Sequence, residues 1–89
     1  MRQHLHISGR VQGVGFRFFA RDHARRLGIK GHVRNLADGG VEVVAEADSS
    51  ILDQFIACLK KGPALAAVQS VKSSPVLSTR SFNTFEIRS

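Results

Sequence analysis

The distribution of apolar residues along the chain predicts two units in which strand and helix follow one another. Leu5 and Ile7 alternate with histidines, in the period of two that is typical of a half-buried strand. From residue 16 onward apolar side chains recur at helical spacing, and Gly28 predicts the end of that helix. Further strands are predicted at about residues 32–36, 41–47 and 68–75 and at the C-terminus, where Phe82, Phe85 and Ile87 mark the last one. The helices are predicted at about residues 16–27 and from the cap at 48–50 to about residue 60.

The order of these elements is βαββαβ, followed by a short strand at the C-terminus. Two units of similar length predict a ferredoxin-like split β-α-β sandwich, which is an α+β fold. Its sheet is mainly antiparallel, and its two helices cover one face. A chain of 89 residues is long enough for one such two-layer core and no more, so residues 1–89 are expected to form a single domain.

The first strand and the first helix are joined by residues 9–17, Gly-Arg-Val-Gln-Gly-Val-Gly-Phe-Arg. The three glycines, Gly9, Gly13 and Gly15, allow backbone amides to turn inward and approach a ligand closely. The helix that follows adds unpaired N–H donors and a partial positive charge. Together these features predict a binding site for a phosphate or a carboxylate. Taken alone, a glycine-rich connection of this kind can also be purely structural, because glycines are common between a strand and a helix.

Arg17 distinguishes this connection from an ordinary one. It falls in the first turn of the predicted helix, where the helix dipole disfavours a cation by about 0.3–1 kcal/mol. No acid precedes Asp22, and Arg21 adds a second positive charge one turn later. An anion bound between the loop amides and the guanidinium would remove this conflict, and we take that as the working hypothesis.

Positive charge is concentrated in the N-terminal part of the chain. The net charge is +6, and residues 1–35 hold eight basic residues against one acid, Asp22. The remaining residues hold five basic and six acidic side chains. This asymmetry suits a small phosphate or a nucleic acid, and a solvated basic surface would explain it equally well.

Composition excludes several other classes. No apolar run approaches the roughly 20 residues of a membrane span, and polar residues interrupt the N-terminus where a signal peptide would be apolar. Cys58 is the sole cysteine, which excludes an internal disulfide and fits a reducing cytoplasm. His4 and His6 have a spacing that could ligate a metal, but no neighbouring ligand completes a set. Solvated histidines and no metal site are therefore expected.

Residues 9–17 do not match two other common phosphate-binding loops. No Gly-Lys-Ser/Thr follows, which excludes a Walker A motif, and the third glycine of a dinucleotide fingerprint is missing. On the second predicted strand, Asn35 offers both a donor and an acceptor, the combination that can hold a water in line for attack on phosphorus. An ordinary asparagine beside the following hairpin turn is the alternative.

These two motifs resemble those of the acylphosphatase family. The likeness rests on residues 9–17, on Gly-His-Val-Arg-Asn at 31–35 and on Gly-Gly-Val at 39–41, and it extends to residues 62–68 and 85–88. It therefore covers nearly the whole chain, with both motifs in the family's order and separation. The sequence departs from the family pattern at His32, Ala47 and Ser89.

The resemblance implies a role for each candidate site residue. Arg17 corresponds to the substrate-binding arginine of the family, and Asn35 corresponds to the asparagine that orients the nucleophilic water. The amides that hold the phosphate fall on Gln12, Gly13, Val14, Gly15, Phe16 and Arg17.

The function implied is that of an acylphosphatase. Such an enzyme hydrolyses the carboxyl–phosphate mixed anhydride of acyl phosphates by in-line attack of water, with no metal, cofactor or covalent intermediate. The leaving group is a carboxylate, whose conjugate acid has a pKa of about 4, so it needs no general acid to protonate it. We expect a cytoplasmic monomer that binds an acyl phosphate, inorganic phosphate or other anions at this site and has no membrane partner.

A ferredoxin-like nucleic-acid-binding module is the main alternative, because RNA recognition motifs share this topology. Residues 15–19, Gly-Phe-Arg-Phe-Phe, have a superficial likeness to the aromatic strand motif of those proteins. Glu42 and Glu46 on the third predicted strand would repel a phosphate backbone, so a nucleic-acid partner is not expected. A domain accessory to carbamoyl-phosphate chemistry in larger maturation enzymes is a third possibility, against which the absence of any further domain argues.

Overall fold

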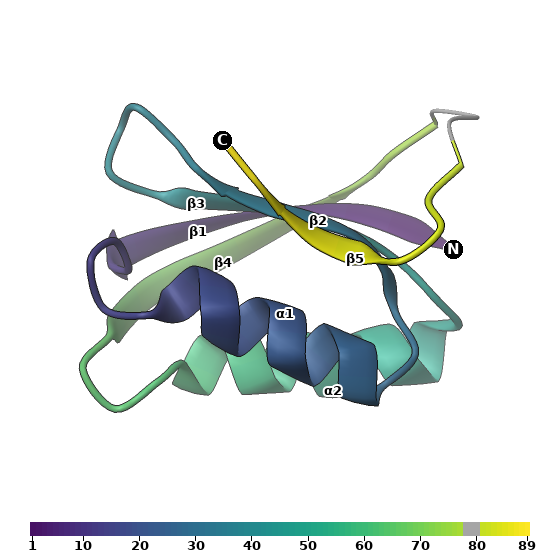
Figure 1. The fold of residues 1–89 in the computed structure, drawn as a ribbon, viewed down its shortest axis with the longest axis horizontal. Coiled ribbons are helices and arrows are strands. Elements are labelled where there is room, and N and C mark those ends of the chain that lie inside the picture. Colours follow the sequence, from purple (N-terminus) through teal and green to yellow (C-terminus); the bar gives the residue numbers. More distant parts are fainter. Residues whose placement is uncertain (78–80) are drawn as a thin grey trace.

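Two helices lie next to each other against one face of a five-stranded β-sheet (Figure 1). The computed structural model describes residues 1–77 and 81–89. The elements are β1 (Arg2–Arg10), α1 (Phe16–Arg26), β2 (Lys30–Asn35), β3 (Val41–Glu46), α2 (Ser49–Lys61), β4 (Ala67–Pro75) and β5 (Phe85–Arg88). The predicted order of helices and strands is therefore confirmed.

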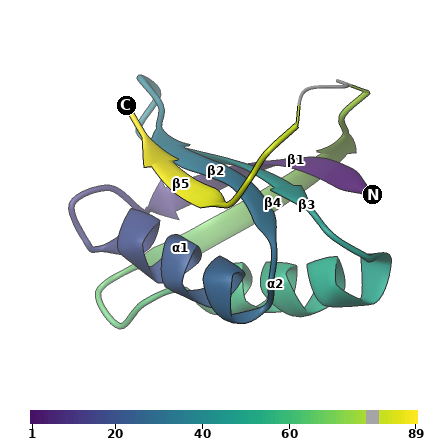
Figure 2. The same cartoon turned by 45° about the vertical axis from the view of Figure 1, so that its right-hand side comes forward.

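The strands are arranged in the order β4-β1-β3-β2-β5. β1 pairs antiparallel with β3 and with β4, and β3 pairs antiparallel with β2. β5 joins the free edge of β2 in the parallel direction. Figure 2 shows both helices on the same side of this sheet. The architecture is the predicted ferredoxin-like α+β sandwich, and it brings the β1–α1 loop and the β2–β3 hairpin to the same end of the molecule (Figure 1).

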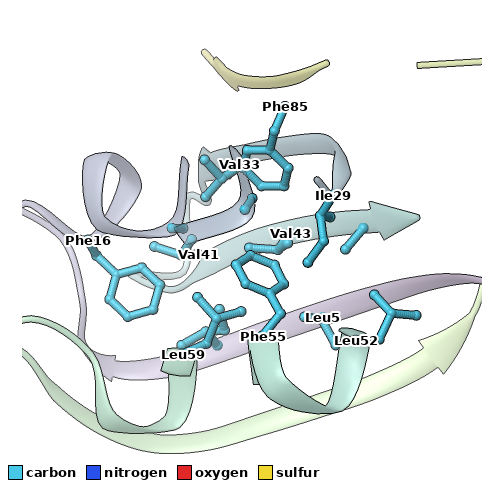
Figure 3. Close-up of a cluster of buried hydrophobic side chains, with 14 of the residues drawn as sticks. Leu5, Phe16, Ile29, Val33, Val41, Val43, Leu52, Phe55, Leu59 and Phe85 are labelled. Atoms are coloured by element: carbon cyan, nitrogen blue, oxygen red, sulfur yellow. The ribbon is translucent and has the colours of Figure 1, made fainter. Parts of the chain in front are cut away.

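The hydrophobic core lies between the sheet and the helices. Leu5 pairs with Val43 and Ile7 pairs with Val41, so the apolar side chains of the two central strands face the helices together. A slip of one residue in this register would turn all of them to the opposite face. Aromatic rings from three elements fill the space between the layers (Figure 3). They belong to Phe16, Phe55 and Phe85.

Each helix buries one side against the sheet. The buried positions recur at intervals of three and four residues, which is the spacing of one helical face. They are Phe16, Ala20 and Ala24 in α1, and Leu52, Phe55 and Leu59 in α2. In the part of the chain that the structure describes, no helix is both long and apolar enough to span a membrane.

Two strand boundaries differ from the prediction. β2 begins at Lys30, because Gly31 is already paired with a neighbouring strand on each side. β5 begins at Phe85, and Phe82 precedes it with its ring 5.8 Å from the ring of His32. Phe82 therefore packs on the side of the sheet that faces away from the helices. The apolar spacing had predicted that it belongs to the last strand.

That outer face of the sheet carries a network of ion pairs around Glu42. Arg34 Nε donates to the Glu42 carboxylate at 2.7 Å, while His4 Nε2 lies 3.0 Å and His32 Nε2 lies 3.4 Å from it. The hydrogen bond from Arg34 is the main reason that the pKa of Glu42 falls to about 2. Burial lowers the pKa of His32 below its ordinary value.

A first prediction concerns two glycines with positive φ, Gly31 at 147° and Gly39 at 91°. A methyl group added at Gly31 would collide with the backbone carbonyl of Val44, whereas one added at Gly39 would meet open space. We expect Gly39→Ala to lower the free energy of unfolding by about 1–2 kcal/mol through backbone strain. Gly31→Ala should cost about 1–3 kcal/mol more, because the neighbouring strand must move. Urea unfolding measures both losses, and equal losses would contradict the predicted clash.

A second prediction concerns acid stability. The pKa of Glu42 is about 2 in the folded chain against an ordinary value of 4.5, so its ion pairs stabilise the fold above pH 4.5. This stability, at most about 3 kcal/mol, is lost as the pH falls toward the folded-state pKa. We expect the difference in free energy of unfolding between the wild type and Glu42→Gln to shrink over that range in urea titrations. Asp53→Asn, at an exposed position of α2, is the control. A difference for Glu42→Gln that stays constant with pH would refute the assignment.

Candidate active site

The connection between β1 and α1 is an open loop shaped by two glycines. Gly13 and Gly15 have φ values of 73° and 78°, in the left-handed region that other residues rarely adopt. Apart from the glycine and its two chain neighbours, no described residue has an atom within 4 Å of the place where a Cβ would stand at either position. The glycines are therefore required by the backbone conformation, and the space beside them is free.

The first turn of α1 presents unused backbone donors to this space. Its first helical hydrogen bond runs from the amide of Phe19 to the carbonyl of Gly15, at 3.0 Å. The amides of Phe16, Arg17 and Phe18 precede that bond and have no acceptor within the helix. The helix has no acidic residue in its first turn and no side-chain cap. These donors and the positive end of the helix dipole therefore favour an anion.

A pocket of about 180 Å³ lies over these amides. It is large enough for several water molecules or for a small anion with a water beside it. Its lining contains no carboxylate, imidazole or thiol among the described residues. The lining residues are Val11, Gly13, Gly15, Phe16, Arg17, Phe18 and Asn35.

The two principal residues predicted from the sequence meet at this pocket. Arg17 comes from the first turn of α1 and is partly exposed. Asn35 is the last residue of β2, where it pairs with Val41 and therefore lies on the sheet face that carries the helices. The pocket thus combines a guanidinium and backbone N–H groups from one element with a carboxamide from another.

The Asn35 side chain leaves one strong acceptor unused. Its Oδ1 atom is buried and has no hydrogen-bond partner among the described residues. Buried polar atoms are nearly always paired, and an unpaired one costs about 1–3 kcal/mol. An unpaired acceptor beside an anion-binding pocket is suited to receive a hydrogen bond from a water or a ligand.

Gln12 and Val14, both predicted in the phosphate-binding loop, lie outside the pocket lining. Val14 is partly buried and packs against the hydrophobic core. The Gln12 side chain crosses to the β2–β3 hairpin, where Nε2 donates to the carbonyl oxygens of Leu36 at 2.7 Å and Gly40 at 2.8 Å. The loop is thereby joined to the strand end that carries Asn35.

Two residues that line the pocket, Val11 and Phe18, were not predicted from the sequence. Val11 is the first residue after β1, and Phe18 follows Arg17 in the first turn of α1. Phe18 could have been identified, because its amide belongs to the unpaired donors that every helix N-terminus presents. For Val11 the sequence offers no signal beyond its position next to the glycine loop.

The paired histidines of β1 do not form a metal site in the part of the chain that the structure describes. His4 pairs with Glu42 and His6 pairs with Asp38, each at 3.0 Å, so they are bound to carboxylates where free solvation had been expected. Among residues 1–77 and 81–89, no cluster of three potential ligands forms.

Comparisons of sequence and of fold relate this chain to known proteins. A sequence model of the acylphosphatase family matches residues 3–87. An acylphosphatase from Treponema denticola is 46% identical over 84 residues, which cover 94% of this chain and 88% of that protein. An acylphosphatase from Archaeoglobus fulgidus is 52% identical over 68 residues, 76% of each chain. The crystal structure of acylphosphatase from Bacillus subtilis superposes with a TM-score of 0.93 at 33% identity and covers 100% of both chains. By sequence and by fold, this chain belongs to the acylphosphatase family.

Proposed function

We propose that this chain hydrolyses acyl phosphates to a carboxylate and inorganic phosphate by direct attack of water on phosphorus. The observation that carries the proposal is the meeting of Arg17, the first amides of α1 and the carboxamide oxygen of Asn35 at one pocket. Within the described part of the chain, that oxygen has no hydrogen-bond partner. Such a site offers what phosphoryl transfer needs most, which is positioning and stabilisation of charge.

The phosphoryl group would be bound by the start of α1. The amides of Phe16, Arg17 and Phe18, with those of the glycine loop, donate to its oxygens, and the guanidinium of Arg17 offsets its negative charge. These donors are held by the helix before the substrate arrives. They therefore stabilise the charge that develops on the oxygens without having to reorganise.

The attacking water would be held by Asn35. Its Oδ1 accepts a hydrogen bond from the water, which leaves a lone pair of the water oxygen free to attack. Since Asn35 lies on the sheet and Arg17 on the helix, water and phosphoryl group are held by different elements. In-line attack requires that these two elements keep a constant separation.

The leaving group places little demand on the protein. A carboxylate departs as a stable anion, because its conjugate acid has a pKa near about 4. The pocket lining holds no side chain that could act as a general acid among the described residues, and this reaction needs none. An acyl phosphate is therefore a better match to the site than a phosphate ester, whose alkoxide must be protonated.

We also propose that residues 1–89 act as a single domain, as a cytoplasmic monomer, and that the product phosphate binds where the substrate does. All lining residues come from the β1–α1 loop, α1 and β2 of one chain, so no second subunit is required. The sole cysteine, Cys58, is free, which suits a reducing compartment.

The nucleic-acid alternative has less support. The aromatic segment at 15–19 lies in the β1–α1 loop and α1, where it cannot form the stacking surface on central strands that RNA recognition motifs use. On the outer face of the sheet, Arg2 binds Glu46 and Arg34 binds Glu42, each at 2.7 Å. These ion pairs neutralise positive charge that a nucleic acid would need.

A third prediction tests Arg17. We expect Arg17→Ala to lower kcat/KM for benzoyl phosphate by at least about 10²–10³-fold, because it removes a donor to the charge that develops in the transition state. It should also weaken competitive inhibition by inorganic phosphate. The assay follows loss of the acyl phosphate with a chelator present. Arg21→Ala removes an arginine one turn further on, where it pairs with Asp22, and serves as the control. Wild-type hydrolysis by Arg17→Ala would rule out the site.

A fourth prediction separates the role of Asn35 from that of Arg17. Asn35→Ala should lower kcat by about 10²–10³-fold, while KM and the inhibition constant of phosphate change little. That pattern is expected when the lost group acts on the water and not on the bound phosphoryl group. A rise in KM with kcat unchanged would instead mean that Asn35 binds the substrate.

A further inference from the structure

The Gln12 side chain is the feature of the site that the proposed function leaves unexplained. Gln12 is partly buried, and its carboxamide is turned away from the pocket toward the β2–β3 hairpin. Nε2 donates to Leu36 O at 2.7 Å and to Gly40 O at 2.8 Å. Both N–H groups of the amide are thus used, each on a different carbonyl.

The two acceptors lie on opposite sides of the hairpin turn. Leu36 directly follows Asn35, and its amide donates to Gly40 O at 2.9 Å, which closes the turn. Gly40 directly precedes β3, and its amide is held by Asp38 Oδ1 at 2.7 Å. Gln12 therefore binds a turn that is already closed by its own hydrogen bonds. Asn35, to which we assign the attacking water, directly precedes this turn.

On the loop side, Gln12 stands next to glycines, which have the greatest backbone freedom of all residues. Gly13 follows it immediately and Gly15 is the N-cap of α1. Both are in the left-handed region, with open space where a Cβ would stand. Glycine has more conformational freedom to lose than any other residue, so a glycine loop needs an external contact to keep one shape. The two hydrogen bonds of Gln12 supply such a contact.

We propose that Gln12 is a positioning residue, which sets the separation between the anion-binding loop and the Asn35 carboxamide. The inference rests on the proposed function, since it assumes that Asn35 acts on the water. Gln12 does not bind the phosphoryl group through its side chain. It joins the β1–α1 loop to the β2–β3 hairpin, through a contact between residues 24 apart in sequence. This contact keeps the distance between phosphoryl group and water within the small range that in-line attack allows.

The chemistry of the contact demands a primary amide. A glutamate at this position has the same shape but presents oxygens to two carbonyl oxygens, so both hydrogen bonds become repulsive contacts. A methionine has nearly the same length and removes the donors without adding charge. An asparagine keeps both donors but is shorter by one methylene group.

We expect Gln12→Glu and Gln12→Met to lower kcat for benzoyl phosphate by about tenfold to a hundredfold. The inhibition constant of inorganic phosphate should rise far less than kcat falls, by less than about threefold, because Arg17 and the amides of α1 are held by the helix itself and only the amides of the glycine loop lose their external contact. Gln54→Glu, at an exposed position of α2, makes the same change of charge and should leave both constants at wild-type values. Gln12→Asn should retain part of the activity. Equal loss of phosphate binding and of kcat in the Gln12 variants would mean that Gln12 only stabilises the loop, which would overturn the inference.

A double-mutant cycle with Asn35→Ala separates this inference from the proposed function. If Gln12 acts through Asn35, then Gln12→Met should lower kcat by less than about threefold once Asn35 has been replaced. Independent, multiplying losses would overturn the positioning role and leave the proposed function intact. Wild-type activity in Asn35→Ala alone would instead refute the water-binding role on which both proposals depend. Gln12→Met adds no buried charge, so it remains informative where Gln12→Glu does not fold, with the melting temperature measured in parallel.

Discussion

The amides of Phe16, Arg17 and Phe18 point out of the first turn of α1, and among the described residues no acidic side chain caps that turn. α2 differs in this respect, because it begins behind Asp48, which places a carboxylate at the positive end of its dipole. α1 begins behind a left-handed glycine and carries an arginine in the same turn. The start of this helix lacks the negative charge of an acidic cap, and the pocket beside it has room for the anion that we propose.

The sheet determines where the other half of the site stands. β3 lies between β1 and β2, and Ile7, Val41 and Asn35 form one row across the three strands. With about 4.8 Å between neighbouring strands, Asn35 and the strand that leads into the glycine loop are roughly 10 Å apart. The β1–α1 loop and the start of α1 span this distance on the face of the sheet that the helices cover. The burial of Phe16 in the core keeps the start of α1 against the strands.

The two faces of the sheet serve different purposes. The face toward the helices is apolar along its length and becomes polar at the end where Asn35 lies. The opposite face holds the ion pairs of Glu42, whose low pKa reflects Arg34 and two histidines and not a catalytic task. His32, one of the departures from the family pattern, belongs to this outer network and contacts Phe82, so it lies away from the pocket.

The sequence by itself determined the parts of the protein that depend on neighbours along the chain. Alternation around Leu5 and Ile7 and the helical spacing after residue 16 predicted the elements, because a strand or a helix repeats its burial every few residues. Glycines ahead of Arg17 indicated the proposed anion site, because a cation in a first helical turn is a conflict that is visible locally. Asn35 was recognisable through the family resemblance, whereas its chemistry alone left an ordinary turn residue equally open.

Only the tertiary structure decided which distant groups meet. It packed Val14 against the core, placed Phe82 on the outer face of the sheet, and gave His4 and His6 carboxylate partners more than 30 residues away. It also left Oδ1 of Asn35 without a hydrogen-bond partner among residues 1–77 and 81–89, and it directed the side chain of Gln12 to the carbonyls of the hairpin. These outcomes depend on strand order and register, which bring together residues that no local period connects, so they follow from the packing of the whole sheet.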